Sequence, residues 1–358
     1  MRKQGCAGPA LRRTESPSFS RLRFPRVLSS LRQQAFQTVE KRAGAVKSVS
    51  VILCTYNRAA SLITALDSFS SLTLPSTLQW ELIIVDNNSK DNTADVVKRY
   101  GETARFPVRY VFEGRQGRSP ALNAGISAAE TEAVAFTDDD VVLHPHWLWN
   151  LTQAFDQFEC AGVAGRVVPL WQHPKPEWLE MEGQQAVVNF ELGDEPKEIR
   201  NEPPLGANSA FRREVFSRYG LFRLDLGVSG ENHGITCEDT EFASRLLRAG
   251  EKLMYIPNAI VYHPVDPVRS SKAYFCRWYY NTGRSMVRAW PPFASVPRFY
   301  GVPRWMFREF GQNLLRWSFN LDPKRRFYHK LKTYRDAGRI IESYRNRGIG
   351  QESVPSKP

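Results

Sequence analysis

The sequence predicts an α/β fold, in which a mostly parallel sheet is flanked by helices, and three observations support this prediction. Short apolar runs rich in Val and Ile alternate with helical patterns between residues 48 and 137, as is typical of parallel sheets. Acidic or polar turns follow several of these runs. The chain has 358 residues, 42% of them hydrophobic, which is enough for one large domain or two ordinary ones. Because open α/β sheets bind ligands where their strands end, the polar turns mark a candidate site.

The elements of the first half follow from residue spacing. Val49–Cys54 and Trp80–Val85 are short apolar runs, as expected of buried strands. Ala59–Ser70 places apolar residues three and four apart, as expected of a helix that covers the sheet. The other elements predicted on these grounds are helix Thr93–Tyr100, strand Val108–Phe112, helix Pro120–Ala129, strand Ala133–Thr137 and helix Pro145–Phe158.

The second half of the chain is less regular. Glu202–Phe216 is predicted to be a loop that leads into a helix. Glu238–Ala249 is amphipathic, and Gly250 suits the C-cap of this helix. Leu253–Ile256 and Ala259–Tyr262 are predicted to be two short strands.

The net charge of +12 is distributed unevenly along the chain. Residues 1–47 hold 11 Lys/Arg against two acids, and residues 268–350 hold 18 against four. Residues 48–267 are acidic, with 19 Lys/Arg and 30 Asp/Glu. An acidic core argues against a compact nucleic-acid binder, so nucleic acid is not an expected partner. The profile fits a cation-binding domain whose basic flanks face an anionic surface, such as that of a membrane.

Features that the sequence lacks exclude other classes. The five cysteines are scattered without a C-x-x-C pair, so we expect reduced thiols and neither zinc ligands nor disulfides. The sequence contains no apolar run of about 18 residues, so we expect no membrane-spanning helix. It also lacks a long apolar stretch near the N-terminus, so we expect no secretory signal. The expected location is cytoplasmic, with peripheral attachment at the cytoplasmic face of a membrane. A dinucleotide fingerprint and a P-loop are both absent, so carboxylates and a metal would hold any bound nucleotide.

The two ends of the chain are predicted to differ from its core. Residues 1–47 are rich in Arg and Ser and are expected to be a disordered extension, although an organelle transit peptide has the same composition. Residues 347–358 are expected to be a flexible tail. Residues 268–346 are predicted to be helical and interleave aromatic residues with Lys and Arg. Three interpretations of this segment remain open: helices lying on anionic lipid, nucleic-acid binding through aromatics, and helices packed on the preceding domain with a basic solvent face.

Asp138, Asp139 and Asp140 directly follow the predicted strand Ala133–Thr137. Like charges so close together repel, and each desolvated carboxylate needs a partner. A hard cation such as Mg²⁺ takes a few carboxylate oxygens together with the phosphates of a substrate. The cluster therefore indicates a metal-dependent enzyme that acts on a phosphorylated ligand. A solvated acidic loop or the start of a helix would explain the same residues.

Seven short segments occur in the order of a known family. They are Val51–Arg58, Ile84–Asp91, Ala121–Gly125, Thr137–Asp140, Gly206–Asn208, Cys237–Phe242 and Tyr262–Pro264. Each segment is a weak signal, but together they resemble the family 2 glycosyltransferases of the GT-A fold, which is built on a Rossmann-like mixed sheet. The resemblance implies a catalytic domain at residues 48–267, with a nucleotide-binding half at 48–145 and an acceptor half at 146–267. The remaining chain would form a basic helical C-terminal extension.

The resemblance also implies roles for individual residues. The nucleotide sugar would be bound by Thr55, Tyr56, Asn57, Arg58, Asp86, Asn88, Arg118, Asp138 and Asp139. Within this set Asp86 would bond the base and Asp139 the ribose. Asp140 and His263 would bind Mn²⁺ or Mg²⁺. The sugar and acceptor would be bordered by Gly206, Ala207 and Asn208.

Asp239 would be the general base, supported by Glu238, and the chemistry of sugar transfer needs such groups. A departing nucleoside diphosphate gains negative charge that a divalent cation neutralises. The acceptor hydroxyl needs a positioned carboxylate to take its proton. In a single displacement this base lies on the face opposite the leaving group, and Asp140 and Asp239 are far apart in the sequence, as that geometry requires.

Each assignment has a structural alternative. Asp239 would also suit the cap or first turn of a helix, and Asp86 would suit the cap of a turn. A lone His such as His263 is commonly structural, and Arg118 would also suit a solvated loop. Cys237 stands where the family often carries Gly, so we expect an altered loop geometry and a site that is sensitive to alkylation.

The expected activity is metal-dependent, inverting transfer of a sugar from a nucleoside-diphosphate sugar to a glycan or a lipid-linked acceptor, in polysaccharide or glycoconjugate biosynthesis. UDP is the first choice of nucleotide, with GDP and dTDP as alternatives. Transfer to polyprenyl phosphate ranks lower, because the acceptor phosphate would have to lie beside the metal site. A catalytically inactive glycosyltransferase-like binding protein is disfavoured by the intact Asp140 and Asp239. Glycoside hydrolysis also uses paired carboxylates, but leaves the Asp triplet unexplained.

Overall fold

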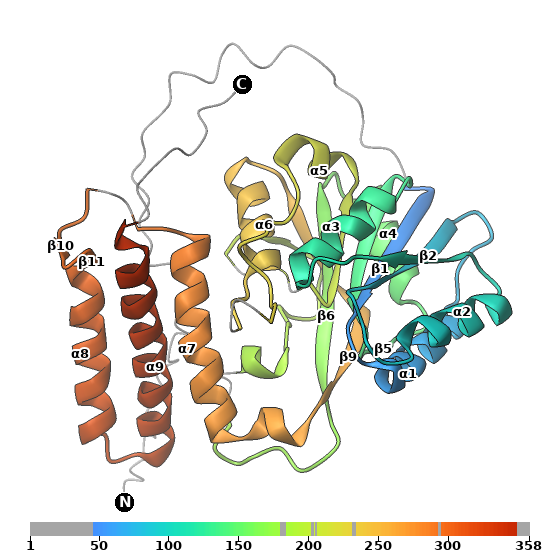
Figure 1. Cartoon of the computed structure of the whole chain (residues 1–358). Helices are drawn as coiled ribbons and strands as arrows, with labels where there is room; N and C mark the ends of the chain where they lie inside the picture. Colours follow the sequence, from blue (N-terminus) through green and yellow to red (C-terminus); the bar gives the residue numbers. More distant parts are fainter. Residues whose placement is uncertain are drawn as a thin grey trace, which may run out of the picture.

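The computed structural model describes residues 46–179, 184–201, 204, 206–230, 234–292 and 295–348. Within these residues a mixed sheet lies between layers of helices, and three long helices stand beside it (Figure 1). Apart from residues 46–47 and 347–348, the predicted N-terminal extension and C-terminal tail lie outside the described residues.

Parallel strands form the first half of the sheet. β1 (Ser48–Thr55) is central and pairs in parallel with β2 (Gln79–Asp86) and with β4 (Ala133–Asp138). β3 (Val108–Phe112) pairs in parallel with the other edge of β2. The helices between these strands are α1 (Ala59–Ser70), α2 (Thr93–Thr103) and α3 (Arg118–Ala128). All seven elements match the predicted ones within three residues at each end.

Beyond β4 the sheet becomes mixed. β8 (Asn208–Arg212) is antiparallel to both β4 and β6 (Gly162–Trp171), and β9 (Leu253–Val265) is parallel to β6. The other elements of this half are β5 (Val142–Leu143), α4 (Trp147–Gln157), η2 (Gln184–Val187), β7 (Lys197–Ile199), α5 (Glu214–Tyr219) and α6 (Glu238–Arg248). The predicted fold class, a mixed and mostly parallel sheet flanked by helices, is confirmed.

The two faces of the sheet bury separate apolar clusters. Because side chains alternate along a strand, Val51 and Leu53 of β1 pack with α1, α2 and α4, whereas Ile52 packs with α3, α5 and α6. Gly125 allows α3 to approach closely, since a Cβ at this position would lie 2.6 Å from Ile52 Cγ2. The helices are thereby fixed against the strands whose ends carry the site.

The prediction of two short strands at Leu253–Ile256 and Ala259–Tyr262 is wrong, because one strand, β9, covers both. The pairing of β9 with β6 shifts, since Gly165 pairs with Ile256 but Arg166 pairs with Ile260. Residues 257–259 therefore form a bulge inside a continuous strand. The Pro-Asn sequence at 257–258 resembles a strand end, but backbone pairing resumes beyond it.

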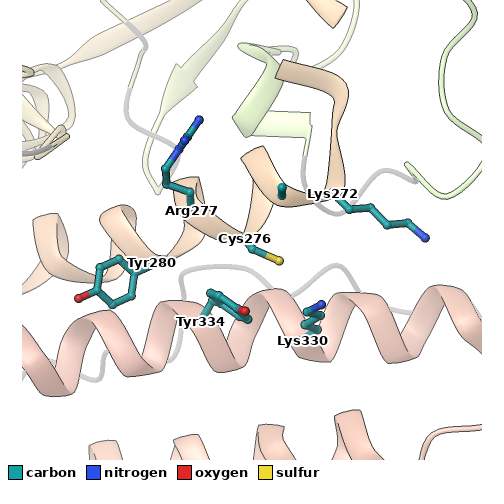
Figure 2. A pocket seen from close by; sticks show the side chains of 7 residues that line it. Lys272, Cys276, Arg277, Tyr280, Lys330 and Tyr334 are labelled. Carbon is teal, nitrogen blue, oxygen red and sulfur yellow. The ribbon is translucent and has the colours of Figure 1, made fainter. Parts of the chain in front are cut away.

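Residues 267–348 form the predicted helical extension, which a long helix joins to the sheet domain. Its elements are η3 (Pro267–Ser270), α7 (Lys272–Ala289), β10 (Arg298–Phe299), β11 (Val302–Pro303), α8 (Arg304–Phe319), α9 (Pro323–Arg345) and η4 (Asn346–Gly348). Phe275 of α7 packs in a cluster with Val265, the last residue of β9. α9 lies between α7 and α8, so that α8 is outermost (Figure 1). α7 and α9 touch each other, and residues of both helices line a groove beside this contact (Figure 2).

Among the helices of the described residues, none is both long enough and apolar enough to cross a membrane.

Candidate active site

The carboxyl ends of the parallel strands bring the predicted site residues together. Because β1 lies between β2 and β4, Thr55 pairs with Asp86 and Cys54 pairs with Asp138. Thr55 is buried at the end of β1, and the loop that follows it carries Arg58. The acids that the sequence places at strand ends therefore share one edge of the sheet, as expected.

Asp86 ends β2 and uses both of its carboxylate oxygens. Oδ1 accepts a hydrogen bond from the backbone N–H of Ser89 at 2.9 Å, and Oδ2 accepts one from the Tyr110 hydroxyl at 2.8 Å. Burial and the hydrogen bond to Asp86 raise the pKa of Tyr110 to about 12, so the phenol keeps its proton and donates. The sequence did not single out Tyr110, whose only signal is a place on the strand next to β2, opposite Ile84.

The loops after β1 and β2 bind each other. Asn57 and Asn88 both adopt positive φ, at 49° and 65°, which Asn tolerates better than most residues. The side-chain oxygen of Asn57 accepts a hydrogen bond from the backbone N–H of Lys90 at 2.6 Å, and its backbone N–H donates to Ser89 Oγ. Tyr56, between the buried Thr55 and the hydrogen-bonded Asn57, is exposed. Asn57 thus fixes the conformation of the loop, and the Tyr56 ring remains exposed to solvent.

The three consecutive aspartates contact two arginines. Arg58 Nη1 lies 3.1 Å from Asp139 Oδ1 and 2.8 Å from Asp140 Oδ2, and Arg118 Nη2 lies 2.6 Å from Asp138 Oδ1. Burial raises the pKa of Asp139, and Arg58 only partly opposes this effect. Burial acts on Asp138 too, but Arg118, His263 and Arg269 together outweigh it and hold the pKa of Asp138 below its usual range. The interpretation as a solvated loop is therefore wrong, because each acid has a cationic partner.

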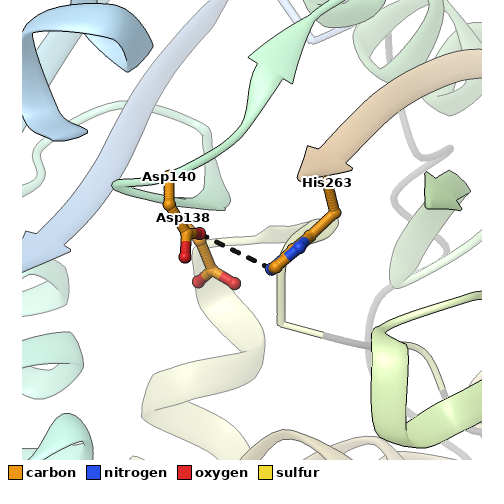
Figure 3. A group of neighbouring side chains, drawn as sticks. All are labelled: Asp138, Asp140 and His263. Carbon is orange, nitrogen blue, oxygen red and sulfur yellow. Dashed lines mark ion pairs between the residues drawn. The ribbon is translucent and has the colours of Figure 1, made fainter. Parts of the chain in front are cut away.

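Asp138, Asp140 and His263 form a possible metal-ligand set. One ligand atom of each lies within 4.8 Å of the others, and His263 Nε2 is 3.5 Å from Asp140 Oδ1 (Figure 3). His263 Nδ1 is 3.0 Å from the backbone oxygen of Pro264, and an imidazole held in this way presents Nε2 as a ligand. Two carboxylates and one imidazole fit Mn²⁺ or Mg²⁺, which complete their coordination with phosphate oxygens and water. Asp138 joins the two ligands that were predicted.

Glu238 and Asp239 begin α6 but occupy different environments. Glu238 is buried, and Arg118 Nε lies 2.8 Å from its Oε1. Burial, and then the neighbouring Asp239, raise the pKa of Glu238 to about 7 against the opposing effect of Arg118. Asp239 is half-buried, and its Oδ2 accepts a hydrogen bond from the backbone N–H of Gly206 at 2.7 Å. Cys237 takes the N-cap position, so Asp239 does not cap the helix, although it lies in the first turn.

Arg118 connects the metal-ligand set with the acids of α6. Its guanidinium contacts Asp138 through Nη2 and Glu238 through Nε. A Cβ placed on Gly206 would lie 3.1 Å from Arg118 Nη2 and 3.3 Å from Asp239 Oδ2. Arg118 is therefore not a solvated loop residue, and a side chain at position 206 would crowd both charged groups.

The predicted Gly206–Asn208 segment divides between the site and the core. Gly206 contacts Asp239, whereas Ala207 and Asn208 are buried. The amide nitrogen of Asn208 donates to the backbone oxygens of Arg166 and Ala259, and its oxygen accepts from Trp147 Nε1. This amide thus holds the bulge of β9, and the structure does not bring it to the acids.

Comparison with known proteins agrees with this arrangement. Residues 50–220 match the family model described as glycosyl transferase family 2. The chain belongs to this family. The glycosyltransferase is 26% identical over 243 residues to the succinoglycan biosynthesis protein ExoM of Rhizobium meliloti, covering 67% of this chain and 74% of ExoM. It is 28% identical over 231 residues to the glucosyl-dolichyl phosphate glucuronosyltransferase of Haloferax volcanii, covering 62% and 71% of the two chains.

A solved structure shows the fold to which the glycosyltransferase belongs. The mannosyltransferase PcManGT from Pyrobaculum calidifontis, in complex with GDP-Man and Mn²⁺, superposes with a TM-score of 0.56 at 19% identity. The match covers 83% of this chain and 87% of that one. The predicted family, the GT-A fold and the assignment as an enzyme are confirmed.

Cys237 of the glycosyltransferase has a backbone that suits glycine. Its φ of 75° lies in the left-handed region, which explains why a loop of this shape favours Gly. Burial raises the pKa of the Cys237 thiol to about 12. Because the thiolate is the reactive form, this pKa argues against the expected sensitivity to alkylation.

Two further residues were missed by the sequence analysis. Arg269 of η3 approaches Asp140 Oδ2 at 3.8 Å, and nothing in its basic segment distinguishes it from its neighbours. Asp91 accepts hydrogen bonds from the backbone N–H of Ala59, at the start of α1, and from Thr93. In the sequence, Asp91 can be recognised as a short polar residue just ahead of α2. Its hydrogen bond to the start of α1, which comes earlier in the chain, is not visible in that local pattern.

Proposed function

We propose that this glycosyltransferase moves a sugar, with inversion, from a nucleoside-diphosphate sugar to a hydroxyl group of a glycan or a lipid-linked acceptor. Mn²⁺ or Mg²⁺ would bind at Asp138, Asp140 and His263. The single observation that supports this most is the division of the acids into two groups. One is the metal-ligand set and the other is Asp239 with Glu238, and Arg118 lies between them.

On the leaving-group side, the proposal assigns Asp86 and the loops after β1 and β2 to the nucleotide. Tyr110 holds Asp86 in place through its hydroxyl, and Tyr56 offers an exposed ring beside it. Asp139 would accept hydrogen bonds from the ribose. When bound, the cation would neutralise the charge that builds on the diphosphate. Arg58 would remain close to the same charge, because it already contacts Asp139 and Asp140.

On the acceptor side, the proposal assigns proton removal to Asp239. The acceptor oxygen forms the new bond to the anomeric carbon while the bond from that carbon to the diphosphate oxygen breaks, and the hydroxyl proton passes to Asp239. Asp239 is the more accessible acid, because Glu238 is 4% exposed and paired with Arg118. The Gly206 N–H fixes Oδ2 of the base. Glu238 would act through Arg118 and Asp239, without touching the acceptor.

Donor and acceptor class remain part of the proposal. A nucleoside diphosphate suits the acids at the strand ends, and the mannosyltransferase of similar fold was solved with GDP-Man and Mn²⁺. A glycan or lipid-linked acceptor agrees with the two relatives, one named for succinoglycan biosynthesis and one for action on glucosyl-dolichyl phosphate. UDP, GDP and dTDP sugars are all candidate donors.

The test is release of nucleoside diphosphate from a panel of UDP, GDP and dTDP sugars with Mn²⁺ and candidate acceptors. We expect turnover with one donor. Asp239→Asn should lower this turnover by roughly 10²–10⁴-fold, as expected for the loss of a general base, while leaving binding of the nucleotide unchanged. Full turnover in Asp239→Asn would show that another group is the general base. The absence of both turnover and nucleotide binding across the panel would contradict the proposed function.

A further inference from the structure

Helix α8 and the hairpin before it expose an apolar face for which the proposed reaction has no use. We define this α8 face by its six residues Phe299, Tyr300, Phe307, Leu314, Leu315 and Phe319. We propose that the α8 face docks on the surface of an anionic lipid bilayer, with α8 lying in the plane of the interface.

Most of α8 is not buried. Among the 16 residues of α8, only Met306 and Asn313 are buried, and they lie seven apart, on one side of the helix. α8 packs mainly on α9, with Met306 in a small buried cluster that also includes Val287 of α7, and it forms the outer edge of the molecule (Figure 1). Leu315 is 60% exposed and Phe319 is 77% exposed. Soluble proteins rarely leave such contiguous apolar side chains without a partner.

The exposed apolar residues of α8 lie on the side of the helix away from Met306 and Asn313. Leu314 and Leu315 follow Phe307 by seven and eight positions, which is about two helical turns. The Phe299 ring lies 6.1 Å from that of Phe307 and 4.6 Å from that of Tyr300, measured between centroids. The hairpin thus extends the apolar face beyond the first turn of α8.

Tyr300 has a backbone conformation that is unusual for an aromatic residue. Phe299 pairs with Val302, so Tyr300 and Gly301 form a two-residue turn, and both have positive φ, at 48° and 80°. Asn or Gly would suit the first position of such a turn better than an aromatic residue. The sequence instead places a Tyr that is 73% exposed at the tip, against its backbone preference and in line with insertion of its ring into an interface.

The segment that contains α8 carries a net positive charge. Residues 304–326 hold six Lys/Arg and two acids, and the acids already have partners, since Glu309 pairs with Arg339 and Asp322 receives the first N–H groups of α9. Arg308 and Arg316 are exposed on α8 itself. Basic side chains beside an apolar helix face are the pattern of helices that lie on anionic lipid.

The groove between α7 and α9 adds cations beside α8. It encloses about 510 Å³ and is lined by Lys272, Arg277 and Lys330 (Figure 2). None of the three forms an ion pair with a carboxylate in the part of the chain that the structure describes. The Lys330 ammonium lies 5.5 Å from the Trp317 ring of α8, which joins the groove to this helix. Lipid phosphates would complement these charges.

Charge and composition also distinguish the bilayer from other occupants. A second copy of the chain would bring Arg308 and Arg316 against a surface of the same sign, which costs energy. Single-stranded nucleic acid prefers stacked aromatic rings, whereas Leu314 and Leu315 of the α8 face are aliphatic. A membrane interface accepts aromatic, aliphatic and basic side chains together.

The test is co-sedimentation of the full chain with vesicles at low salt. We expect binding to vesicles of phosphatidylcholine mixed with phosphatidylglycerol, and little binding to phosphatidylcholine alone. Leu315→Glu and Phe319→Glu should each weaken binding about tenfold or more, because each places an acid in the apolar layer. Ile63→Glu is the matched control, since Ile63 is an exposed helical residue of α1, at 49%, outside the α8 face.

Thermal unfolding and donor hydrolysis would establish that the variants are folded. The proposal is overturned if the wild-type chain does not bind anionic vesicles, or if Leu315→Glu and Phe319→Glu bind them as the wild type does. It is also overturned if light scattering shows a wild-type dimer that Leu315→Glu dissociates, or if these substitutions abolish binding to an oligonucleotide and spare the vesicles. The membrane proposal does not depend on the identity of the donor or the acceptor.

Discussion

Arg118 is the residue through which the two acidic groups of the site interact. Its guanidinium contacts Asp138 on one side and Glu238 on the other. Movement of either acid therefore changes the interaction that Arg118 makes with the other acid. Arg58 has a simpler role, because both of its carboxylate partners belong to the Asp triplet. The two arginines pair with four acids, which are Asp138, Asp139, Asp140 and Glu238, and so allow these acids to converge at one edge of the sheet.

The buried Glu238 predicts a dependence of stability on pH. Its pKa is raised from 4.5 to about 7 in the folded protein, chiefly by burial. The folded chain therefore keeps a proton that the unfolded chain releases. Its stabilising effect is fully present below pH 4.5 and is lost as the pH rises through about 7. The free energy of unfolding should fall by up to roughly 3 kcal/mol across this window.

Urea denaturation of the wild type and of Glu238→Gln, in the absence of metal, would measure this effect. The Gln variant has no proton to lose at this position, so the difference in stability between the two proteins should change across the window. Glu195→Gln is the control, because Glu195 is exposed and its substitution should leave the wild-type slope unchanged. Parallel profiles for wild type and Glu238→Gln would show that Glu238 is ionised in the folded protein throughout.

Some site residues could be predicted from the sequence, and others could not, for a physical reason. Asp138–Asp140 and Asp239 lie beside a strand end and a helix start, which local patterns reveal. Tyr110 and Arg269 act on acids 24 and 129 residues away, so only the folded chain brings them into contact. Asn208 was expected near the sugar, but its amide holds a bulge at Ala259, and this bulge is defined only by the pairing of β9 with the distant strand β6.

Among the elements, α7 and α9 make the closest helix contact. Gly283 of α7 and Gly338 of α9 allow this approach, since a Cβ on Gly338 would lie 2.1 Å from the Tyr280 backbone oxygen. Beside the crossing, Arg284 Nε lies 2.9 Å from Glu342 Oε2, and both side chains are buried. The ion pair and the glycines depend on one another, because a wider crossing would separate the charges.

This contact predicts opposite effects for two Gly→Ala substitutions. Gly338→Ala should lower the free energy of unfolding by roughly 1–3 kcal/mol, because backbone must move to admit the methyl group. Gly311→Ala on α8 should raise it by about 1 kcal/mol, since Ala favours helix and no atom lies within 4 Å of the added Cβ. Urea denaturation would measure both. Stabilisation by Gly338→Ala would show that the backbones of α7 and α9 are not in contact at Gly338.

The elements themselves were predicted with uneven success. The difference is explained by how far apart in the sequence the hydrogen-bonded partners of each element lie. Helices Ala59–Ser70 and Glu238–Ala249 follow from local spacing, and their observed bounds agree within one residue. The continuity of β9 depends instead on pairing with β6, whose sequence lies about ninety residues earlier. The helical extension was expected as a whole, but its three-helix arrangement rests on contacts such as Gly338 with Tyr280.

At the scale of the whole molecule, the site joins elements that are remote in the sequence. The metal-ligand set comes from the end of β4 and from β9, and its neighbours come from the loop before α1, from α3 and from η3. A ligand bound here therefore bridges the parallel and the mixed halves of the sheet. Because only the folded chain assembles the set, binding should stabilise the fold as a whole.

The last prediction is that Mn²⁺ raises the temperature of unfolding of the wild type, and more so with a nucleoside diphosphate present. At a hundred times its dissociation constant, a ligand adds about 2.7 kcal/mol to the free energy of unfolding. Asp140→Asn should lose most of the shift that Mn²⁺ causes, because it removes one of three ligands. The control is Asp194→Asn, at an exposed acid outside the site, which should keep the full shift.

Equal Mn²⁺ shifts in Asp140→Asn and the wild type would exclude Asp138, Asp140 and His263 as the metal site. A nucleotide shift that persists without Mn²⁺ in both proteins would assign nucleotide binding to Asp86 and the loops after β1 and β2.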